Sequence, residues 1–150
     1  MTNKEASMFT EGLRSTGNIV QSTPQDFFDK LNRIFRFTLD VCALPCNAKC
    51  DEFFTPEIDG LKQEWRGGVW CNPPYGREIG AWVGKACEEI QKDYCNFIVM
   101  LLPARTDARW FQDYVLGKAT LHFVKGRLKF GDGKGSAPFP SVLAIYTRRQ

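Results

Sequence analysis

The chain has 150 residues, and its 43% hydrophobic and 25% charged residues are typical of a single water-soluble globular domain. No apolar run approaches the length of a membrane span and the polar N-terminus is not a signal peptide, so we expect a cytoplasmic protein without membrane contact. The formal net charge is +3, but residues 96–150 hold 9 Lys/Arg and only 3 Asp/Glu. This basic third indicates a surface for a polyanion, and the alternative is an ordinary solvated basic face.

The six cysteines and the single histidine do not have the pattern of a metal site. Cys42, Cys46 and Cys50 are spaced by four, the other cysteines are scattered, and no Cys-x-x-Cys pair occurs. Zinc sites usually have four ligands at tighter spacings. We therefore expect no metal and reduced thiols.

The first half of the chain alternates between expected helices and strands. Residues 1–20 are polar and predict a flexible lead, so that one domain spans 21–150. Proline in the first helical turn and an apolar face predict a helix over 25–35. Strands are expected at 37–41, with Asp40 near the end, at 53–55 and at 68–71, with an irregular segment at 42–50 and a helical turn at 59–65.

The second half continues the alternation. Helices are expected at 79–93 and 108–116, and strands at 96–102, 120–124 and 142–147, the last two joined by a long segment rich in Gly and Lys. Alternating strands and helices predict an α/β sheet with mainly parallel strands, in which the final two strands are antiparallel to each other. About ten residues separate Asp40 from Phe53, so a full crossover helix and a second strand hardly fit between them.

The most informative segment is Asn72-Pro73-Pro74-Tyr75, which follows the expected strand at 68–71. Two prolines in a row cannot continue a strand, so the chain turns out at its C-terminal end, where open α/β sheets bind ligands. The Asn72 oxygen and the Pro73 carbonyl can accept both N–H bonds of an exocyclic amine, and Tyr75 can stack on a flat ring. The alternative is an ordinary turn or a polyproline ligand for a partner domain.

The order of the motifs resembles that of the phage-type DNA N6-adenine methyltransferases, from about Gln21 to about Thr147. The segments that carry the resemblance are 22–24 (STP), 39–43 (LDVCA), 47–50 (NAKC), 59–61 (DGL) followed by Trp65, 71–76 (CNPPYG), 102–107 (LPARTD) and 126–130 (GRLKF). Each is short, but their order and spacing together are specific. The resemblance implies a reduced Rossmann-like methyltransferase sheet with an antiparallel C-terminal strand. It also implies S-adenosylmethionine as cofactor, and N6 of an adenine flipped out of double-stranded DNA as the methyl acceptor.

The family likeness also implies roles for single residues. The catalytic turn is Asn72, Pro73, Pro74 and Tyr75. Thr23 and Pro24 border the methionine end of the cofactor, and Asp40 faces the same cofactor, with a solvated or capping acid as the alternative. Asp59 accepts a hydrogen bond from the cofactor's adenine amine, or serves as a helix N-cap, or does both. No Gly-x-Gly loop follows Asp40, and the acid that usually holds the ribose has no clear counterpart, with Asp51 and Glu52 as candidates.

The basic third supplies the expected DNA contacts, which are Arg105, Lys125, Arg127, Lys129 and Lys134. The alternative functions are methylation of another planar amine, such as cytosine N4 or RNA guanine N2, methylation of glutamine in proteins, and a non-catalytic DNA-binding module with a decayed cofactor site. The family suggests protection of DNA against restriction as a biological role.

Overall fold

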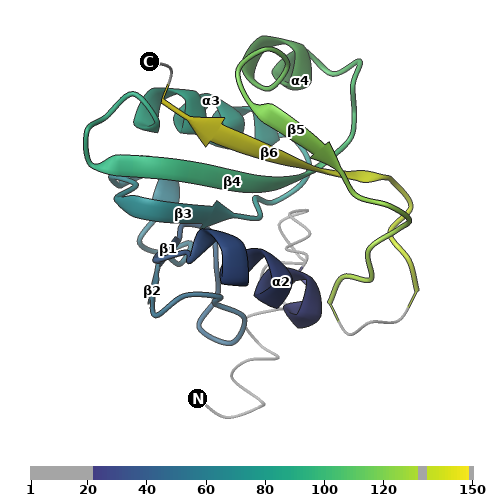
Figure 1. The fold of residues 1–150 in the computed structure, drawn as a ribbon, viewed down its shortest axis with the longest axis horizontal. Helices are drawn as coiled ribbons and strands as arrows, with labels where there is room; N and C mark the ends of the chain where they lie inside the picture. Colours follow the sequence, from purple (N-terminus) through teal and green to yellow (C-terminus); the bar gives the residue numbers. More distant parts are fainter. Residues whose placement is uncertain (1–21, 132–134, 149–150) are drawn as a thin grey trace.

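The structure is a computed structural model that describes residues 22–131 and 135–148, so the expected N-terminal lead and Lys134 lie outside the described residues. The described chain forms one sheet with helices on both faces (Figure 1). In chain order the elements are α2 (Gln25–Phe35), β1 (Leu39–Asp40), β2 (Glu52–Phe53), the 3-10 turn η1 (Gly60–Lys62), β3 (Gly67–Cys71), α3 (Ile79–Glu89), β4 (Cys95–Pro103), α4 (Arg109–Tyr114), β5 (Thr120–Phe123) and β6 (Ser141–Thr147).

The sheet has six strands in the order β2-β1-β3-β4-β6-β5. Strands β1 to β4 pair in parallel, whereas β6 is antiparallel to both β4 and β5. Only β6 therefore runs against the others, which confirms the expected mainly parallel sheet with an antiparallel C-terminal strand. The expectation that the last two strands are antiparallel to each other is also confirmed.

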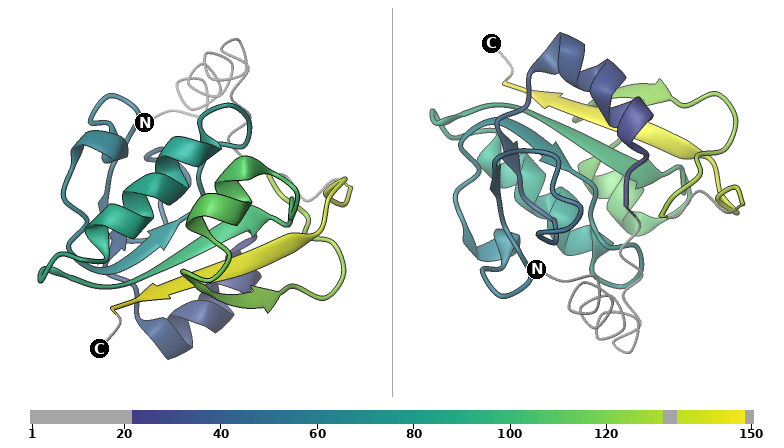
Figure 2. Two further views of the ribbon diagram at one scale, coloured as in Figure 1. Left: turned by 90° about the horizontal axis from the view of Figure 1, so that it is seen from above. Right: turned by 90° about the horizontal axis from the view of Figure 1, so that it is seen from below.

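The buried strands alternate their side chains between two apolar layers. Val69 and Cys71 of β3 and Ile98, Met100 and Leu102 of β4 pack with α3 and α4, while Trp70, Val99 and Leu101 pack with α2. Figure 2 shows α2 on one face of the sheet and α3 and α4 on the other. Parallel strands covered on both faces require such continuous apolar runs, and this explains why 96–102 reads as a buried strand.

Several element boundaries differ from the sequence-based expectation. Helix α2 has the predicted bounds, but α3 ends at Glu89 rather than Asp93 and α4 spans Arg109–Tyr114 rather than 108–116. After α3 the chain forms a tighter turn, in which the backbone N–H of Gln91 donates to the carbonyl of Glu88 and that of Lys92 to the carbonyl of Glu89. No helix in the described ranges has the length and apolar character needed to cross a bilayer.

The sequence left little room after β1 for a full crossover helix together with a second strand, and the chain forms the strand without the helix. Strand β2 pairs in parallel with β1 through Leu39 to Glu52 and Asp40 to Phe53. The crossover contains no helix, and an irregular loop over residues 41–51 replaces it. Two-residue strands need little length, so a loop alone returns the chain to the edge of the sheet.

Candidate active site

The sheet topology brings the ends of β1 and β3 together. From β1 the chain goes to β2 on one side, and β3 then pairs on the other side of β1. This reversal is the switch point at which open α/β sheets bind ligands, beyond the carboxyl ends of the strands. Asp40 is the last residue of β1, and Asn72 follows β3 directly. Both predicted site residues therefore lie at this point of the sheet.

The turn after β3 is buried, and residues before the first helix hold it. Asn72 is 8% exposed, Pro73 and Pro74 are buried, and the Asn72 Nδ2 atom donates a hydrogen bond to Thr23 Oγ1 at 3.0 Å. This bond fixes the plane of the Asn72 amide. Thr23, expected at the cofactor, thus contacts the Asn72–Tyr75 turn itself.

Ser22, next to Thr23, forms hydrogen bonds to the loop after β1 and to the connection between β5 and β6. Its hydroxyl accepts from Asn47 Nδ2 at 3.1 Å, and its carbonyl accepts from the backbone N–H of Gly131 at 3.1 Å. Pro24 is the N-cap of α2, and its carbonyl accepts from Phe28 N at 3.1 Å. Pro24 therefore starts the helix, and of the residues expected at the methionine end Thr23 is the one that reaches the turn.

Tyr75 belongs to a group of three aromatic rings. Its ring meets those of Phe139 and Phe130 edge-on, with centroids 5.4 Å and 6.2 Å away, and its hydroxyl donates to the Leu101 carbonyl at 3.2 Å. Burial raises the pKa of Tyr75, so the phenol is neutral at physiological pH. Arg105 lies over the Phe139 ring, 5.9 Å from its centroid. The sequence analysis missed Phe130 and Phe139, whose only signal is that Phe130 alternates with basic residues in GRLKF.

Asp40 is buried at the end of β1, 2% exposed, and its carboxylate organises the loop that follows. One oxygen accepts from Cys42 N at 3.2 Å and the other accepts from Lys49 N at 3.0 Å. The carboxylate therefore caps the backbone of this loop. The carboxylate also lines a narrow crevice with Thr23 and Asn72. Burial raises its pKa to about 6, and the two backbone bonds and the positive charge of Lys49 oppose that rise.

The raised pKa of Asp40 predicts a specific dependence of stability on pH. In the unfolded chain the pKa returns to about 4, so between about pH 4 and 6 the folded protein binds more protons than the unfolded chain. The contribution of Asp40 to the free energy of unfolding therefore falls as pH rises through this window, by up to about 3 kcal/mol. Asp40→Asn should abolish this fall in denaturant titrations at pH 4.5 and 7.5. Identical pH slopes in wild type and variant, with exposed Asp26→Asn as the control, would contradict a buried ionising Asp40.

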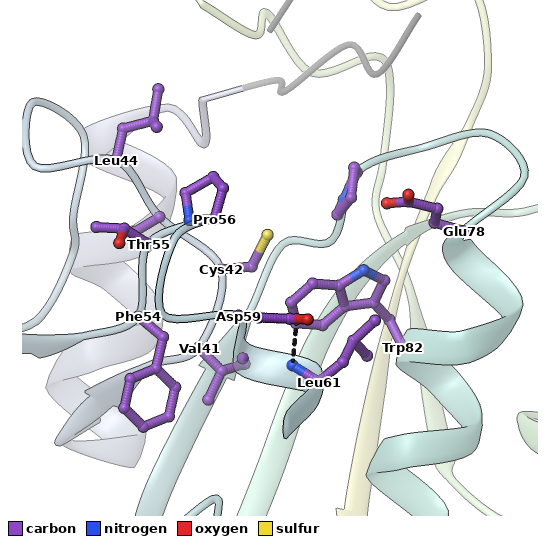
Figure 3. A pocket seen from close by; sticks show the side chains of 13 residues that line it. Val41, Cys42, Leu44, Phe54, Thr55, Pro56, Asp59, Leu61, Glu78 and Trp82 are labelled. Atoms are coloured by element: carbon purple, nitrogen blue, oxygen red, sulfur yellow. Dashed lines mark hydrogen bonds between the residues drawn. The ribbon is translucent and has the colours of Figure 1, made fainter. Parts of the chain in front are cut away.

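A larger cavity of about 550 Å³ opens beside the crevice (Figure 3). Its lining comes from residues 41–44, 54–56 and 59–61 and from Pro74, Glu78 and Trp82. Cys42 lines both the cavity and the crevice, so the two spaces adjoin. Burial raises the pKa of the Cys42 thiol above its usual range, so the thiol is neutral. Asp51 and Glu52, the candidates for a ribose contact, are exposed and line neither space.

Asp59 has both features that the sequence left as alternatives. It is the N-cap of η1, where its Oδ1 atom accepts from Leu61 N at 3.1 Å, and it lines the cavity. Figure 3 shows the carboxylate beside the Trp82 indole. One carboxylate can therefore cap the turn and present its second oxygen to a ligand.

The four basic residues of the expected DNA surface that lie among the described residues are exposed. Arg105 follows β4, while Lys125, Arg127 and Lys129 lie on the connection between β5 and β6. Between them Leu128 and Phe130 pack against the α2 side of the core, so the charged side chains point outward. A backbone bond from Ala137 N to Leu128 O at 2.8 Å closes this connection on itself. The structure keeps both alternatives open, a DNA contact and a solvated face.

Neutralising this connection tests its role in DNA binding. Arg127→Gln with Lys129→Gln should flatten the dependence of log affinity on log salt by roughly two units, because each phosphate contact releases about one counterion. The change should be similar for different DNA sequences, since phosphates carry no sequence information. The matched control is Lys30→Gln with Arg33→Gln on the exposed side of α2. An unaltered slope in the first double variant would remove the connection from the DNA surface.

Known proteins of one family match most of this chain. The model of the family described as DNA N-6-adenine-methyltransferase (Dam) matches residues 14–142. A protein of Escherichia phage T1, described as a DNA N-6-adenine-methyltransferase, is 34% identical over 110 residues, which cover 71% of this chain and 45% of the phage protein. A protein of Haemophilus phage HP1 with the same description is 29% identical over 134 residues, covering 83% of this chain and 76% of that protein. The match thus spans less than half of the T1 protein. These matches show that the chain belongs to the DNA N-6-adenine-methyltransferase (Dam) family.

Proposed function

We propose that this chain transfers a methyl group from S-adenosylmethionine to the N6 amine of adenine in double-stranded DNA. The observation that carries the proposal is the buried Asn72–Tyr75 turn, which lies between a nucleoside-sized cavity and a group of three aromatic rings. We interpret the sheet as a reduced Rossmann-like methyltransferase sheet. Because DNA is the substrate, we place the protein in the cytoplasm of the bacterial host, where methylation can protect DNA against restriction.

The side chains around the switch point offer the chemistry that the two halves of S-adenosylmethionine need, although the crevice of about 10 Å³ would have to widen to hold the methionine half. The cavity is partly apolar and offers an acceptor at Asp59 and an N–H at Trp82, which suits adenosine. The crevice combines the Asp40 carboxylate with Lys49, whose ammonium donates to Gln25 Oε1 at 2.8 Å. An acid and a lysine suit the ammonium and carboxylate of the methionine half. Cys42, which lines both spaces, would lie beside the junction of the two halves.

Glu78 replaces the missing ribose acid in this proposal. It lines the cavity, and Figure 3 shows its carboxylate directed toward that space. The residue is the N-cap of α3, but its side chain makes no capping hydrogen bond, so the carboxylate is available to accept from the ribose hydroxyls. Its position one turn after the catalytic turn explains why a search at the second strand did not find it.

The methyl transfer itself needs little chemistry from the protein. S-adenosylmethionine supplies a methyl group already activated as a sulfonium, so positioning and charge complementarity remain for the chain. The Asn72 oxygen and the Pro73 carbonyl would accept the two N6 hydrogens and stabilise the positive charge that develops on nitrogen. Tyr75, with Phe130 and Phe139, would hold the base after it leaves the duplex, and stacking on an aromatic side chain is worth roughly 1–3 kcal/mol per base.

A single assay tests this function. The protein is incubated with labelled S-adenosylmethionine and unmethylated DNA, and the digested nucleosides are analysed by mass. We expect N6-methyladenosine as its deoxynucleoside. N4-methylcytosine would assign another planar amine, and cofactor binding without any methylated nucleoside on varied DNA would favour the non-catalytic module.

A further inference from the structure

The indole nitrogen of Trp82, a residue in the wall of the cavity, is a buried donor without an acceptor among the described residues. Trp82 is 6% exposed and lines the cavity, and its Nε1 atom has no hydrogen-bond partner within residues 22–131 and 135–148. Buried tryptophan N–H groups usually find an acceptor, because an unpaired buried donor costs free energy. The unpaired nitrogen therefore indicates that an acceptor belongs there when the site is in use.

In the neighbouring Trp65, by contrast, the indole N–H has a hydrogen-bond acceptor. The two indoles stack with centroids 6.2 Å apart and an interplanar angle of 28°. Trp65 Nε1 donates to the Gly60 carbonyl at 2.8 Å, so its N–H is used within the fold. The Trp82 ring is held by packing, because a methyl group added at Gly60 would lie 3.1 Å from its Cη2 atom.

The acceptor and the donor at this wall of the cavity distinguish adenine from guanine. Asp59 offers only an acceptor and the indole offers only a donor. Adenine has an exocyclic amine that donates and ring nitrogens N1, N3 and N7 that accept. Guanine instead carries a carbonyl at the position of that amine and would place two acceptors, its own and Asp59, against each other.

We propose that the Trp82 indole N–H donates a hydrogen bond to a ring nitrogen of the cofactor's adenine and thereby helps to select an adenosine cofactor. The inference rests on the proposed use of S-adenosylmethionine. The nitrogen is covered by neighbouring atoms, so the acceptor reaches it only after a neighbour moves. Glu78 is exposed and makes no capping bond, and Figure 3 shows it on the side of the indole nitrogen. Trp82 is then a positioning residue for the cofactor, remote from the transferred methyl group.

The experiment measures calorimetric affinities for S-adenosylhomocysteine and its 1-deaza, 3-deaza and 7-deaza analogues, each of which lacks one ring acceptor. Wild type should bind one analogue about tenfold more weakly than S-adenosylhomocysteine. Trp82→Phe should bind S-adenosylhomocysteine and that analogue equally. Trp65→Phe is the matched control, and it should keep the wild-type preference because its N–H serves the fold.

A second measurement, by nuclear magnetic resonance, uses the wild-type protein and so does not require that any variant folds. The chain has 4 tryptophans, so the wild-type proton–nitrogen correlation spectrum contains four indole signals. One of them should move downfield with S-adenosylhomocysteine but not with the discriminating analogue. Equal wild-type affinity for all four ligands, or equal losses for all four in Trp82→Phe, would overturn the role of Trp82 and leave the cofactor assignment intact. No binding of S-adenosylhomocysteine by wild type would contradict the proposed function and, with it, this inference.

Discussion

Asn72→Ala should lower the rate of methyl transfer by roughly 10²–10³-fold or more, the loss typical of removing one group that stabilises charge in a transition state. The reason is the proposed role of the side-chain oxygen, which would accept from the attacking amine while its positive charge develops. Cofactor affinity should fall much less than the rate, because Asn72 borders only the crevice proposed for the methionine half and does not line the large cavity proposed for adenosine. Single-turnover methylation and calorimetry with S-adenosylhomocysteine measure the two effects separately.

The variant also removes the bond to Thr23, so a control for lost stability is needed. Asn32→Ala serves this purpose, because the Asn32 oxygen accepts from Phe37 N at 2.8 Å at the end of α2, far along the chain from the turn. It should lower stability without slowing turnover. Near-normal methylation by Asn72→Ala would show that the chemistry lies elsewhere.

Asp59→Ala should weaken S-adenosylhomocysteine binding by roughly 10–100-fold, since a hydrogen bond to a charged group contributes about 1.5–3 kcal/mol. The variant also loses the cap of η1, which costs about 1 kcal/mol of stability. Asp59→Asn separates the two effects. Asparagine caps as well as aspartate does, but with its oxygen on Leu61 N it turns an NH₂ group toward the adenine amine.

We therefore expect Asp59→Asn to keep wild-type stability and lose cofactor affinity. It should also reverse the preference between S-adenosylhomocysteine and S-inosylhomocysteine, because the inosine carbonyl accepts from the new NH₂ group. DNA affinity in the absence of cofactor should be unchanged in both variants. Unaltered cofactor affinity in Asp59→Ala would leave the residue as a cap alone.

The sequence predicted those parts of the fold that depend on local patterns. Thr23-Pro24 and the apolar face beyond them predicted the bounds of α2, and the two prolines after β3 predicted the turn at the sheet edge. Strand β2 was uncertain for a physical reason. Its two residues are held by pairing with β1 and by the loop that Asp40 organises, and such tertiary contacts have no periodic signal.

Trp82 and Phe139 were not singled out from the sequence for a different reason. Trp82 lies at helical spacing with apolar neighbours and reads as core, and it is indeed 6% exposed. Only the three-dimensional count of donors and acceptors shows that its nitrogen lacks an acceptor among the described residues. Phe139 is separated from Tyr75 by more than sixty positions in the chain, so their contact depends on how the β5–β6 connection folds back.

Ser22 and Thr23 make three long-range bonds that have a practical consequence. Through them the chain before α2 touches the loop after β1 at Asn47, the catalytic turn at Asn72 and the basic connection at Gly131. Any shortened version of the protein that starts at the first helix would lose all three attachments at once. Expression designs, affinity tags and protease sites should therefore be kept upstream of Ser22, even though every predicted catalytic residue lies some fifty positions further along the chain.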